Sequence, residues 1–186
     1  LRAEKQLNHR GRAQAPQASR QPTTHIAHAP NEVWVWDISY LPSTVTGRFF
    51  YLYMVEDLYS RYGVVWEVHD KESGEHAADL LEKACWREKL HGKKPVLHSD
   101  NGSPMKSQTL RAKLEALGIS PSFSRPRVSG DNAYVEAFFR TLKYAPLWPA
   151  KGFATLEEAR EWVQTFMHWY NHGHQHSNIR FVTPAQ

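Results

Sequence analysis

The sequence predicts a single α/β domain on a five-stranded mixed sheet, in which three antiparallel strands are followed by two parallel strands and helices flank the sheet. Three observations support this fold class. Closely spaced apolar runs fill residues 33–68, the hydrophobic period becomes helical after residue 73, and short apolar runs then alternate with helical stretches. A chain of 186 residues, 41% of them hydrophobic, is long enough for one sizeable core.

The first three strands are predicted at residues 33–40, 49–57 and 62–68. A turn containing Gly47 follows the first, and only residues 58–61 separate the other two, so we expect an antiparallel meander. The first strand is apolar on both faces, which is typical of a strand in the middle of a sheet.

The second half of the chain alternates helices and strands. Ser107 is a favourable helix N-cap, Gly118 a favourable helix stop, and Thr155 begins a capping box with Glu158. The predicted elements are a helix at 73–90, a strand at 95–102, a helix at 107–117, a strand at 119–123, a helix at 131–143 and a helix that starts after residue 155.

The helix predicted at 131–143 has two different faces. At 100° per residue, its apolar stripe is centred about 110° from Glu136 and consists of Val135, Phe138, Phe139 and Leu142. Asn132, Arg140 and Lys143 fall within about 40° of Glu136. A single carboxylate among donors and cations favours a site for a metal and a polyanion. An ordinary solvated helix face is the alternative.

Positive charge is concentrated in two parts of the chain, whose formal net charge is +4. Residues 1–30 have several cations against Glu4 and no hydrophobic period, so we expect a basic extended arm or linker before a core domain at 31–186. A second basic stretch, between residues 101 and 151, surrounds a few acids. Such charge suits a phosphate-backbone partner, and it also suits plain solubility.

Three acids lie at chemically informative places. Asp37 interrupts an apolar strand, where a carboxylate costs several kcal/mol unless it is paired, hydrogen-bonded or bound to metal. A structural Asp bonded to a loop amide is the alternative. Asp100 follows a short strand, the usual place for ligands in open α/β sheets. Residues 101–135, a stretch of 35, separate Asp100 from Glu136.

The order of elements and acids resembles the catalytic core of retroviral-integrase-like transposases, the Asp-Asp-(35)-Glu group with a ribonuclease H-like fold. Bacterial insertion-sequence transposases encoded by a second open reading frame are the most similar. The resemblance covers about 30–184, and the motifs that carry it are 36–40 (WDISY), 57–61 (DLYSR), 98–102 (HSDNG), 124–126 (SRP), 131–139 (DNAYVEAFF), 142–143 (LK) and 170–171 (YN). His174 stands where the family often has Arg, and 144–151 is unusually rich in Pro and Trp.

The resemblance implies that Asp37, Asp100 and Glu136 are the catalytic residues and the ligands of Mg²⁺ or Mn²⁺, with two ions when DNA is bound. In-line displacement at phosphorus needs charge stabilised on the attacking and the leaving oxygen, which two ions about 3.5–4 Å apart provide. Carboxylates are the ligands that such hard cations prefer. The implied activity is nicking at the ends of a mobile element followed by strand transfer.

Further roles follow from the same resemblance. Lys143 matches the family's DNA-contacting Lys, and Arg140 is expected to meet phosphate on the same face. The other expected DNA contacts are Lys106, Arg125 and Arg127. The residues expected to support the metal ligands are His98, Asn101 and Asn132, with the alternative that His98 only packs. We expect the 124–130 loop to be unordered without DNA.

The expected partner is DNA, at mobile-element ends and at the target, with a homo-oligomer assembled on it. No run of about 18 apolar residues predicts a membrane span, and the lone Cys85 favours a reducing compartment, so we expect a bacterial, nucleoid-associated cytoplasmic protein. Histidines at 172–176 are expected to be polar surface and not a metal tract. Two other functions remain open: a hydrolysis-only nuclease of the same fold, and a non-catalytic DNA-binding or assembly module.

Overall fold

A computed structural model describes residues 25–90, 93–100, 102, 107–124 and 133–186. The sheet has five strands in the order β3-β2-β1-β4-β5. The strands are β1 (Val33–Pro42), β2 (Phe49–Asp57), β3 (Gly63–His69), β4 (Val96–Ser99) and β5 (Ser120–Phe123). The first three pair antiparallel, and β4 and β5 run parallel to β1. The predicted mixed sheet is therefore confirmed.

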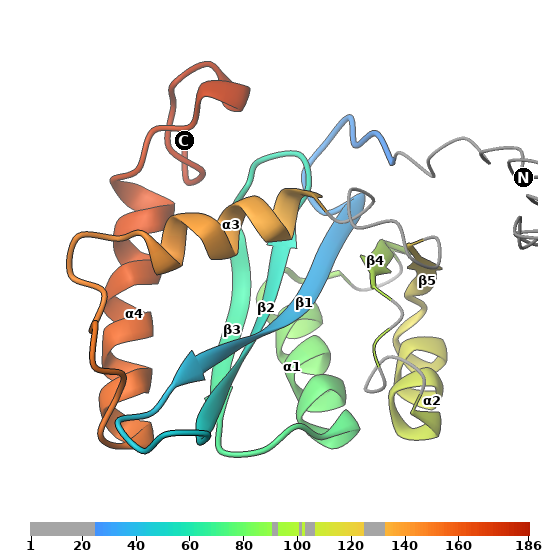
Figure 1. The fold of residues 1–186 in the computed structure, drawn as a ribbon. Coiled ribbons are helices and arrows are strands. Elements are labelled where there is room, and N and C mark those ends of the chain that lie inside the picture. Colours follow the sequence, from blue (N-terminus) through green and yellow to red (C-terminus); the bar gives the residue numbers. More distant parts are fainter. Residues whose placement is uncertain (1–24, 91–92, 101, 103–106, 125–132) are drawn as a thin grey trace, which may run out of the picture.

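Helices cover both faces of the sheet (Figure 1). The helices are α1 (Gly74–Arg87), α2 (Gln108–Leu117), α3 (Ala133–Lys143) and α4 (Leu156–His172). Alternate residues of β1 enter two cores: Val33 and Val35 pack with α3 and α4, while Trp34 and Trp36 pack with α1 and α2. The first strand is therefore buried on both faces, as its sequence predicts.

The ends of the helices follow the predicted capping signals. The side chain of Ser107 accepts a hydrogen bond from the amide of Leu110, and Gly118 ends α2 with a φ of 70°. Thr155 accepts from the amide of Glu158 at the start of α4. Gly118 adopts the left-handed conformation that glycine reaches without a steric penalty, so these residues fix where the helices begin and end.

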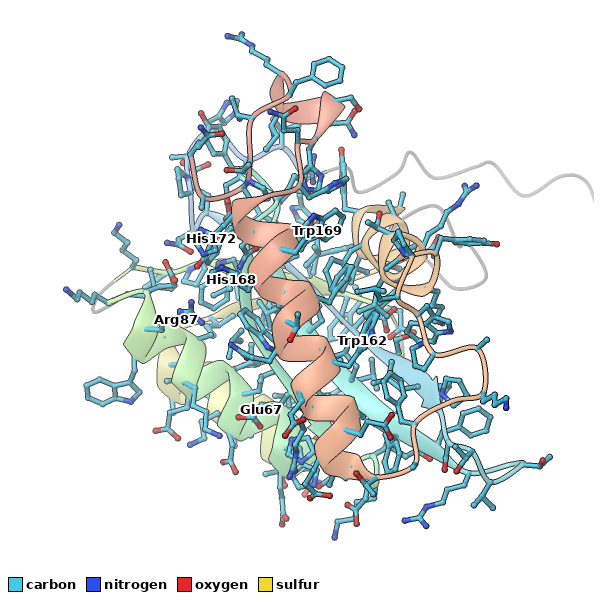
Figure 2. The ribbon with its side chains drawn as sticks, turned by 90° about the vertical axis from the view of Figure 1, so that its left-hand side faces the viewer. Glu67, Arg87, Trp162, His168, Trp169 and His172 are labelled. Carbon is cyan, nitrogen blue, oxygen red and sulfur yellow. The ribbon has the colours of Figure 1, made fainter. Side chains whose placement is uncertain are left out.

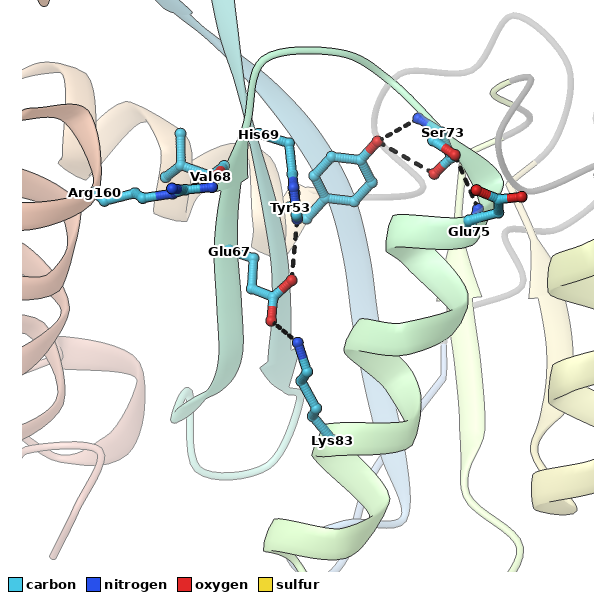
Figure 3. A network of polar contacts seen from close by, with 8 residues as sticks. All are labelled: Tyr53, Glu67, Val68, His69, Ser73, Glu75, Lys83 and Arg160. Atoms are coloured by element: carbon cyan, nitrogen blue, oxygen red, sulfur yellow. Dashed lines mark hydrogen bonds and ion pairs between the residues drawn. The ribbon is translucent and has the colours of Figure 1, made fainter. Parts of the chain in front are cut away.

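Polar contacts hold the edge strand β3 to the helices on both sides (Figure 3). Glu67 of β3 forms an ion pair with Lys83 of α1, and a hydrogen bond of 3.0 Å joins it to the ring of His69. From the other side, Arg160 of α4 donates through Nε to the carbonyl of Val68 at 3.0 Å. These contacts fix the edge of the sheet between α1 and α4.

The helix α4 presents different side chains on its two flanks (Figure 2). Trp162 and Trp169 point toward the segment that joins α3 to α4, and His168 and His172 lie on the opposite flank. The indole N–H of Trp162 donates to the carbonyl of Leu147 at 2.8 Å. The Pro- and Trp-rich stretch at 144–151 is thus held against α4 by aromatic contacts.

A buried amide links α4 to the sheet. Asn171 is 1% exposed. Its Oδ1 accepts from the amide of Gly63 at 2.8 Å, and its Nδ2 donates to the carbonyl of Gly63 at 3.1 Å. Because Gly63 begins β3, this side chain satisfies both backbone groups of the strand's first residue. The motif at 170–171 therefore has a structural role.

Candidate active site

The pairing of β1 with β4 brings two of the predicted acids together. Val35 pairs with His98 and Trp36 with Ser99 in a parallel register. The next step along both strands is Asp37 and Asp100. Asp100 directly follows the last residue of β4, and its Oδ1 accepts from the amide of Gly102 at 2.8 Å.

The third acid comes from the helix above this position. Asp37 follows Val33 and Val35 in the alternation of β1, so it faces the side that α3 covers. The helix α3 packs against β1, with Val135, Phe138, Phe139 and Leu142 buried. Glu136 lies on its exposed side. The buried stripe therefore docks α3 and leaves Glu136 free to face the site.

The electrostatics of Asp37 link it to other predicted site residues. Burial raises the pKa of Asp37 to about 7, the amide of Ile38 opposes that rise, and the charges of Asp100 and Glu136 add to it. Lys143 lowers the same pKa. The structure therefore brings the three acids and Lys143 into one electrostatic neighbourhood.

The structural alternative for Asp37 is not what the contacts show. Its Oδ1 accepts at 2.8 Å from the amide of Ile38, the next residue in the same strand, and not from a loop amide. A half-buried carboxylate that faces two other acids is electrostatically unfavourable without a cation. This arrangement is unlike a carboxylate that serves only to close a loop.

The chemistry of the donor set fits a hard divalent cation. The site offers carboxylate oxygens from three elements, and Mg²⁺ prefers oxygen ligands and retains waters. Across the described residues, no three acidic, His or Cys side chains form a group that could hold a metal ion. Metal binding by the three carboxylates therefore stays a prediction.

The remaining predicted residues divide into two groups. Arg140 and Lys143 are exposed on α3, and the guanidinium of Arg140 lies 5.9 Å from the ring centre of Tyr144. The predicted residues that lie outside the described part of the chain are Asn101, Lys106, Arg125, Arg127 and Asn132. The same holds for residues 125–130 of the predicted unordered loop and for residues 1–24 of the arm.

His98 is buried where β4 meets β5. Its ring nitrogens lie 3.1 Å from Oγ of Ser122 and 3.3 Å from Oγ of Ser124. His25, in the segment before β1, also bonds Ser122, at 2.7 Å. These contacts tie the two strands and the incoming chain together, as the packing alternative predicts. Support of the metal ligands by His98 stays a prediction.

Two buried polar groups escaped the sequence analysis. Glu56 ends the apolar run of β2 and is only 1% exposed, and Arg61 lies in the turn that follows. Burial raises the pKa of Glu56 to about 8, against an opposing effect of Arg61 and of the hydroxyl of Tyr170. Two successive acids, Glu56 and Asp57, at the end of an otherwise apolar strand were the available signal.

Glu56 should make the stability of the protein pH-dependent. Its pKa is about 8 in the folded state and 4.5 ordinarily, so the folded protein keeps a proton that the unfolded chain loses. Stability should therefore fall as pH rises from about 4.5 to about 8, by at most about 1.4 kcal/mol per pH unit.

The variant Glu56→Gln should lack this part of the slope and gain stability relative to wild type above pH 8. Urea unfolding between pH 5 and pH 9 measures the difference, with the exposed Glu115→Gln as control. Parallel stability curves for Glu56→Gln and wild type would show that Glu56 ionises normally.

Comparison with known proteins places the chain among integrase core domains and insertion-sequence transposases. A family model described as an integrase core domain matches residues 27–129, and a second integrase core domain model matches residues 117–184. The Lactococcus lactis transposase for insertion sequence element IS904 is 32% identical over 160 residues, covering 85% of this chain and 61% of that protein. The Escherichia coli transposase InsF for IS3A is 32% identical over 161 residues, 86% of this chain and 54% of that protein.

A putative Mycobacterium tuberculosis transposase for IS986/IS6110 is 30% identical, and the match covers 85% of this chain and 58% of that protein. The chain thus spans little more than half the length of these relatives. No helix among the described residues is long and apolar enough to cross a membrane.

Solved structures confirm the ribonuclease H-like fold. A simian T-cell lymphotropic virus intasome chain aligns with a TM-score of 0.63 at 18% identity, over 92% of this chain and 59% of that chain. The magnesium-bound HTLV-2 integrase catalytic core domain, in its trimeric form, aligns with a TM-score of 0.60 at 18% identity, over 87% of this chain and 98% of that one.

Proposed function

The chain belongs to the integrase core domain family, and on that premise we propose that it is the catalytic core of a bacterial insertion-sequence transposase that nicks and joins DNA. One observation carries the proposal: Asp37, on the face of β1 that α3 covers, lies within electrostatic reach of Asp100, Glu136 and Lys143. A partly buried carboxylate near other acids costs free energy, and a cation-dependent reaction accounts for its presence on the strand.

Each acid has a separate role in the proposal. Asp37 would bridge two cations, Asp100 would hold one and Glu136 the other. Bound Mg²⁺ or Mn²⁺ supplies positive charge to the attacking and leaving oxygens of a phosphodiester. The sheet fixes Asp37 and Asp100 on adjacent strands, whereas Glu136 is placed by a helix that docks through side-chain packing.

The proposed reaction has two balanced steps. Water first attacks a phosphorus at the element's end, one P–O bond forms and another breaks, and a 3′-hydroxyl is released. That hydroxyl then attacks a target phosphodiester, forming a new P–O bond and releasing a target 3′-hydroxyl. Arg140 and Lys143, exposed on the helix that bears Glu136, would hold the phosphate backbone.

The full-length protein, incubated with duplex DNA carrying the terminal sequences that flank its coding sequence, tests the activity. We expect nicked ends and joined products with Mg²⁺ and neither product with EDTA. Nicks without joined products would identify a nuclease, and DNA binding without either product would identify an assembly module. Absence of Mg²⁺-dependent products under conditions of DNA binding contradicts the proposal.

Lys143 should contribute to DNA affinity through one phosphate contact. We expect Lys143→Gln to weaken binding to all DNA sequences similarly and to reduce the slope of log affinity against log salt by about 1. Lys94→Gln is the matched control, because Lys94 is exposed and precedes β4, at the end opposite to Asp100. Equal slopes for the two variants, measured by fluorescence anisotropy, would remove Lys143 from the DNA interface.

The proposal extends to assembly and location. Relatives of known structure include an intasome and integrase core domains in dimeric and trimeric forms. We therefore expect the full-length protein to work as a multimer that holds two DNA ends, in the bacterial cytoplasm where the DNA lies.

A further inference from the structure

A polar pocket of about 270 Å³ lies between α3, the end of β2 and the segment after α4. Tyr134 and Thr141 line it from the side of α3 that lies about 140–160° from Glu136 around the helix. The pocket brings together two motifs that the acid site does not use: 57–61, which ends at Arg61, and 170–171, which begins at Tyr170.

Arg61 is held in this pocket without a hydrogen-bonding acceptor for part of its guanidinium. Its Nε and Nη1 are buried and have no hydrogen-bond partner among the described residues. The guanidinium instead lies 3.8 Å from the ring centre of Tyr134. Unpaired buried donors of a charged group cost stability, and the cation–π contact offsets only part of that cost.

The nearby acid in the same motif does not pair with Arg61. The two oxygens of Asp57 accept from the amide of Asn31 at 2.8 Å, and from the amide and hydroxyl of Ser60 at 2.8 and 2.6 Å. Arg61 itself adopts a φ of 64°, a conformation that an Arg takes only at a cost. The backbone of the turn is therefore strained at Arg61, and the guanidinium that it presents to the pocket does not pair with Asp57.

The other titratable groups that face Arg61 are uncharged at neutral pH. Burial raises the pKa of Glu56 to about 8, so its carboxyl is protonated, and its Oε2 has no hydrogen-bond partner among the described residues. Burial, then His174 and Arg61, lowers the pKa of His176 to about 4, and burial also lowers that of His174. Tyr170 keeps its proton because burial and Glu56 raise its pKa.

The pocket thus combines one positive charge with several hydrogen-bond donors. Besides Nε and Nη1 of Arg61, Nε2 of His176 is buried and unpartnered among the described residues, and it donates in the tautomer that carries the proton there. The tail that carries His176 is fixed: the amide of His176 donates to the carbonyl of Val182 at 3.1 Å. A singly charged oxyanion suits such a set, because its oxygens accept hydrogen bonds from a guanidinium and carry the opposite charge.

We propose that this pocket binds a phosphate group through the guanidinium of Arg61. A DNA backbone phosphodiester and free inorganic phosphate share this chemistry, and the DNA source rests on the proposed function. A DNA strand held there would contact α3 on the side away from Glu136. DNA would then contact this helix on two opposite sides. A purely structural Arg61, which only fixes Tyr134, would not respond to phosphate.

NMR of the arginine Nε–H groups in the 186-residue chain tests the site directly. Titration with inorganic phosphate, against sodium chloride of equal ionic strength, should shift the Arg61 signal saturably. Arg61→Lys keeps the charge but loses the planar guanidinium and its several N–H donors, so phosphate affinity followed at the His176 ring should fall about tenfold or more. Arg48→Lys, an exposed Arg on the turn between β1 and β2, should bind as wild type.

A second titration, with a short duplex in EDTA, separates the two sources. A shift of the Arg61 signal that excess phosphate reverses identifies the DNA backbone, and a response to inorganic phosphate alone identifies free phosphate. Equal responses to phosphate and chloride, or equal phosphate affinity in Arg61→Lys and Arg48→Lys, overturn the proposal. Failure of Mg²⁺-dependent nicking would overturn the proposed function and leave the phosphate titration unaffected.

Discussion

Replacing Asp37 with Asn in the full-length protein is expected to reduce metal-dependent DNA nicking by about a thousandfold or more. The substitution removes the carboxylate that would bridge two cations, and cations at such sites stabilise the transition state by several kcal/mol. Each 1.36 kcal/mol is a tenfold change in rate, so a loss of this size follows if the bridge is broken. Single-turnover nicking of labelled duplex DNA measures it.

The same variant should remain folded, which separates loss of chemistry from loss of structure. Above pH 7 the ionised Asp37 is opposed by burial and by the charges of Asp100 and Glu136. Its raised pKa means that ionisation lowers stability there, so Asp37→Asn should be at least as stable as wild type at pH 8. Asp79→Asn, an exposed acid on α1, is the control that should keep full activity. Nicking by Asp37→Asn at the wild-type rate would exclude a catalytic Asp37.

Replacing Asn171 with Ala is expected to lower the free energy of unfolding by about 2–4 kcal/mol. The variant loses the amide that bonds both the N–H and the C=O of Gly63 in a buried environment. Each buried backbone group left without a partner costs about 1–3 kcal/mol. The loss falls on the first residue of β3 and on the end of α4, so we expect the edge of the sheet to loosen.

Urea unfolding of Asn171→Ala and Gln164→Ala gives a matched comparison. Both side chains are amides on α4, but Gln164 is exposed, and its side chain accepts a hydrogen bond from the indole of Trp66. Loss of an exposed hydrogen bond should cost less than about 1 kcal/mol. Similar decreases in the free energy of unfolding of the two variants would mean that the buried Asn171 hydrogen bonds stabilise the fold no more than an exposed one.

Local sequence signals were sufficient for most of the fold. The second strand lies at Phe49–Asp57, where the apolar run between two turns placed it. The first strand extends to Pro42, beyond the predicted residue 40, because its pairing with β2 continues to Phe49. The fourth strand stops at Ser99, before the predicted residue 102, and Oδ1 of Asp100 instead accepts a hydrogen bond from the amide of Gly102.

The placement of the three acids on these elements was predictable for a different reason. Asp37 is an acid in an otherwise apolar strand, β1. Asp100 follows β4, which pairs parallel to β1, so the sheet topology alone brings the two acids to neighbouring positions. Glu136 is the acid on the exposed side of an amphipathic helix that packs on β1. Their spacing and the resemblance to transposases supplied the chemistry that the sheet alone does not specify.

The pocket around Arg61 was not predictable, because its parts are far apart in the chain. Glu56 and Tyr170, whose hydroxyl donates to Glu56 at 3.4 Å, are 114 positions apart. The prediction that the histidine tail is polar surface was only partly right, since His174 and His176 are half-buried. They are covered because the tail folds back, with the amide of Ala185 donating to the carbonyl of Asn171 at 3.0 Å.

Crystals of the full-length protein on terminal DNA, soaked in Mn²⁺, test the central claim most directly. Anomalous scattering locates manganese independently of any assumption about ligands. We predict manganese held by Asp37, Asp100 and Glu136, as two ions when DNA is bound, and no such signal in Asp100→Asn crystals. Manganese bound elsewhere on DNA-loaded protein, with these three carboxylates apart and free of metal, would contradict the assignment of this site.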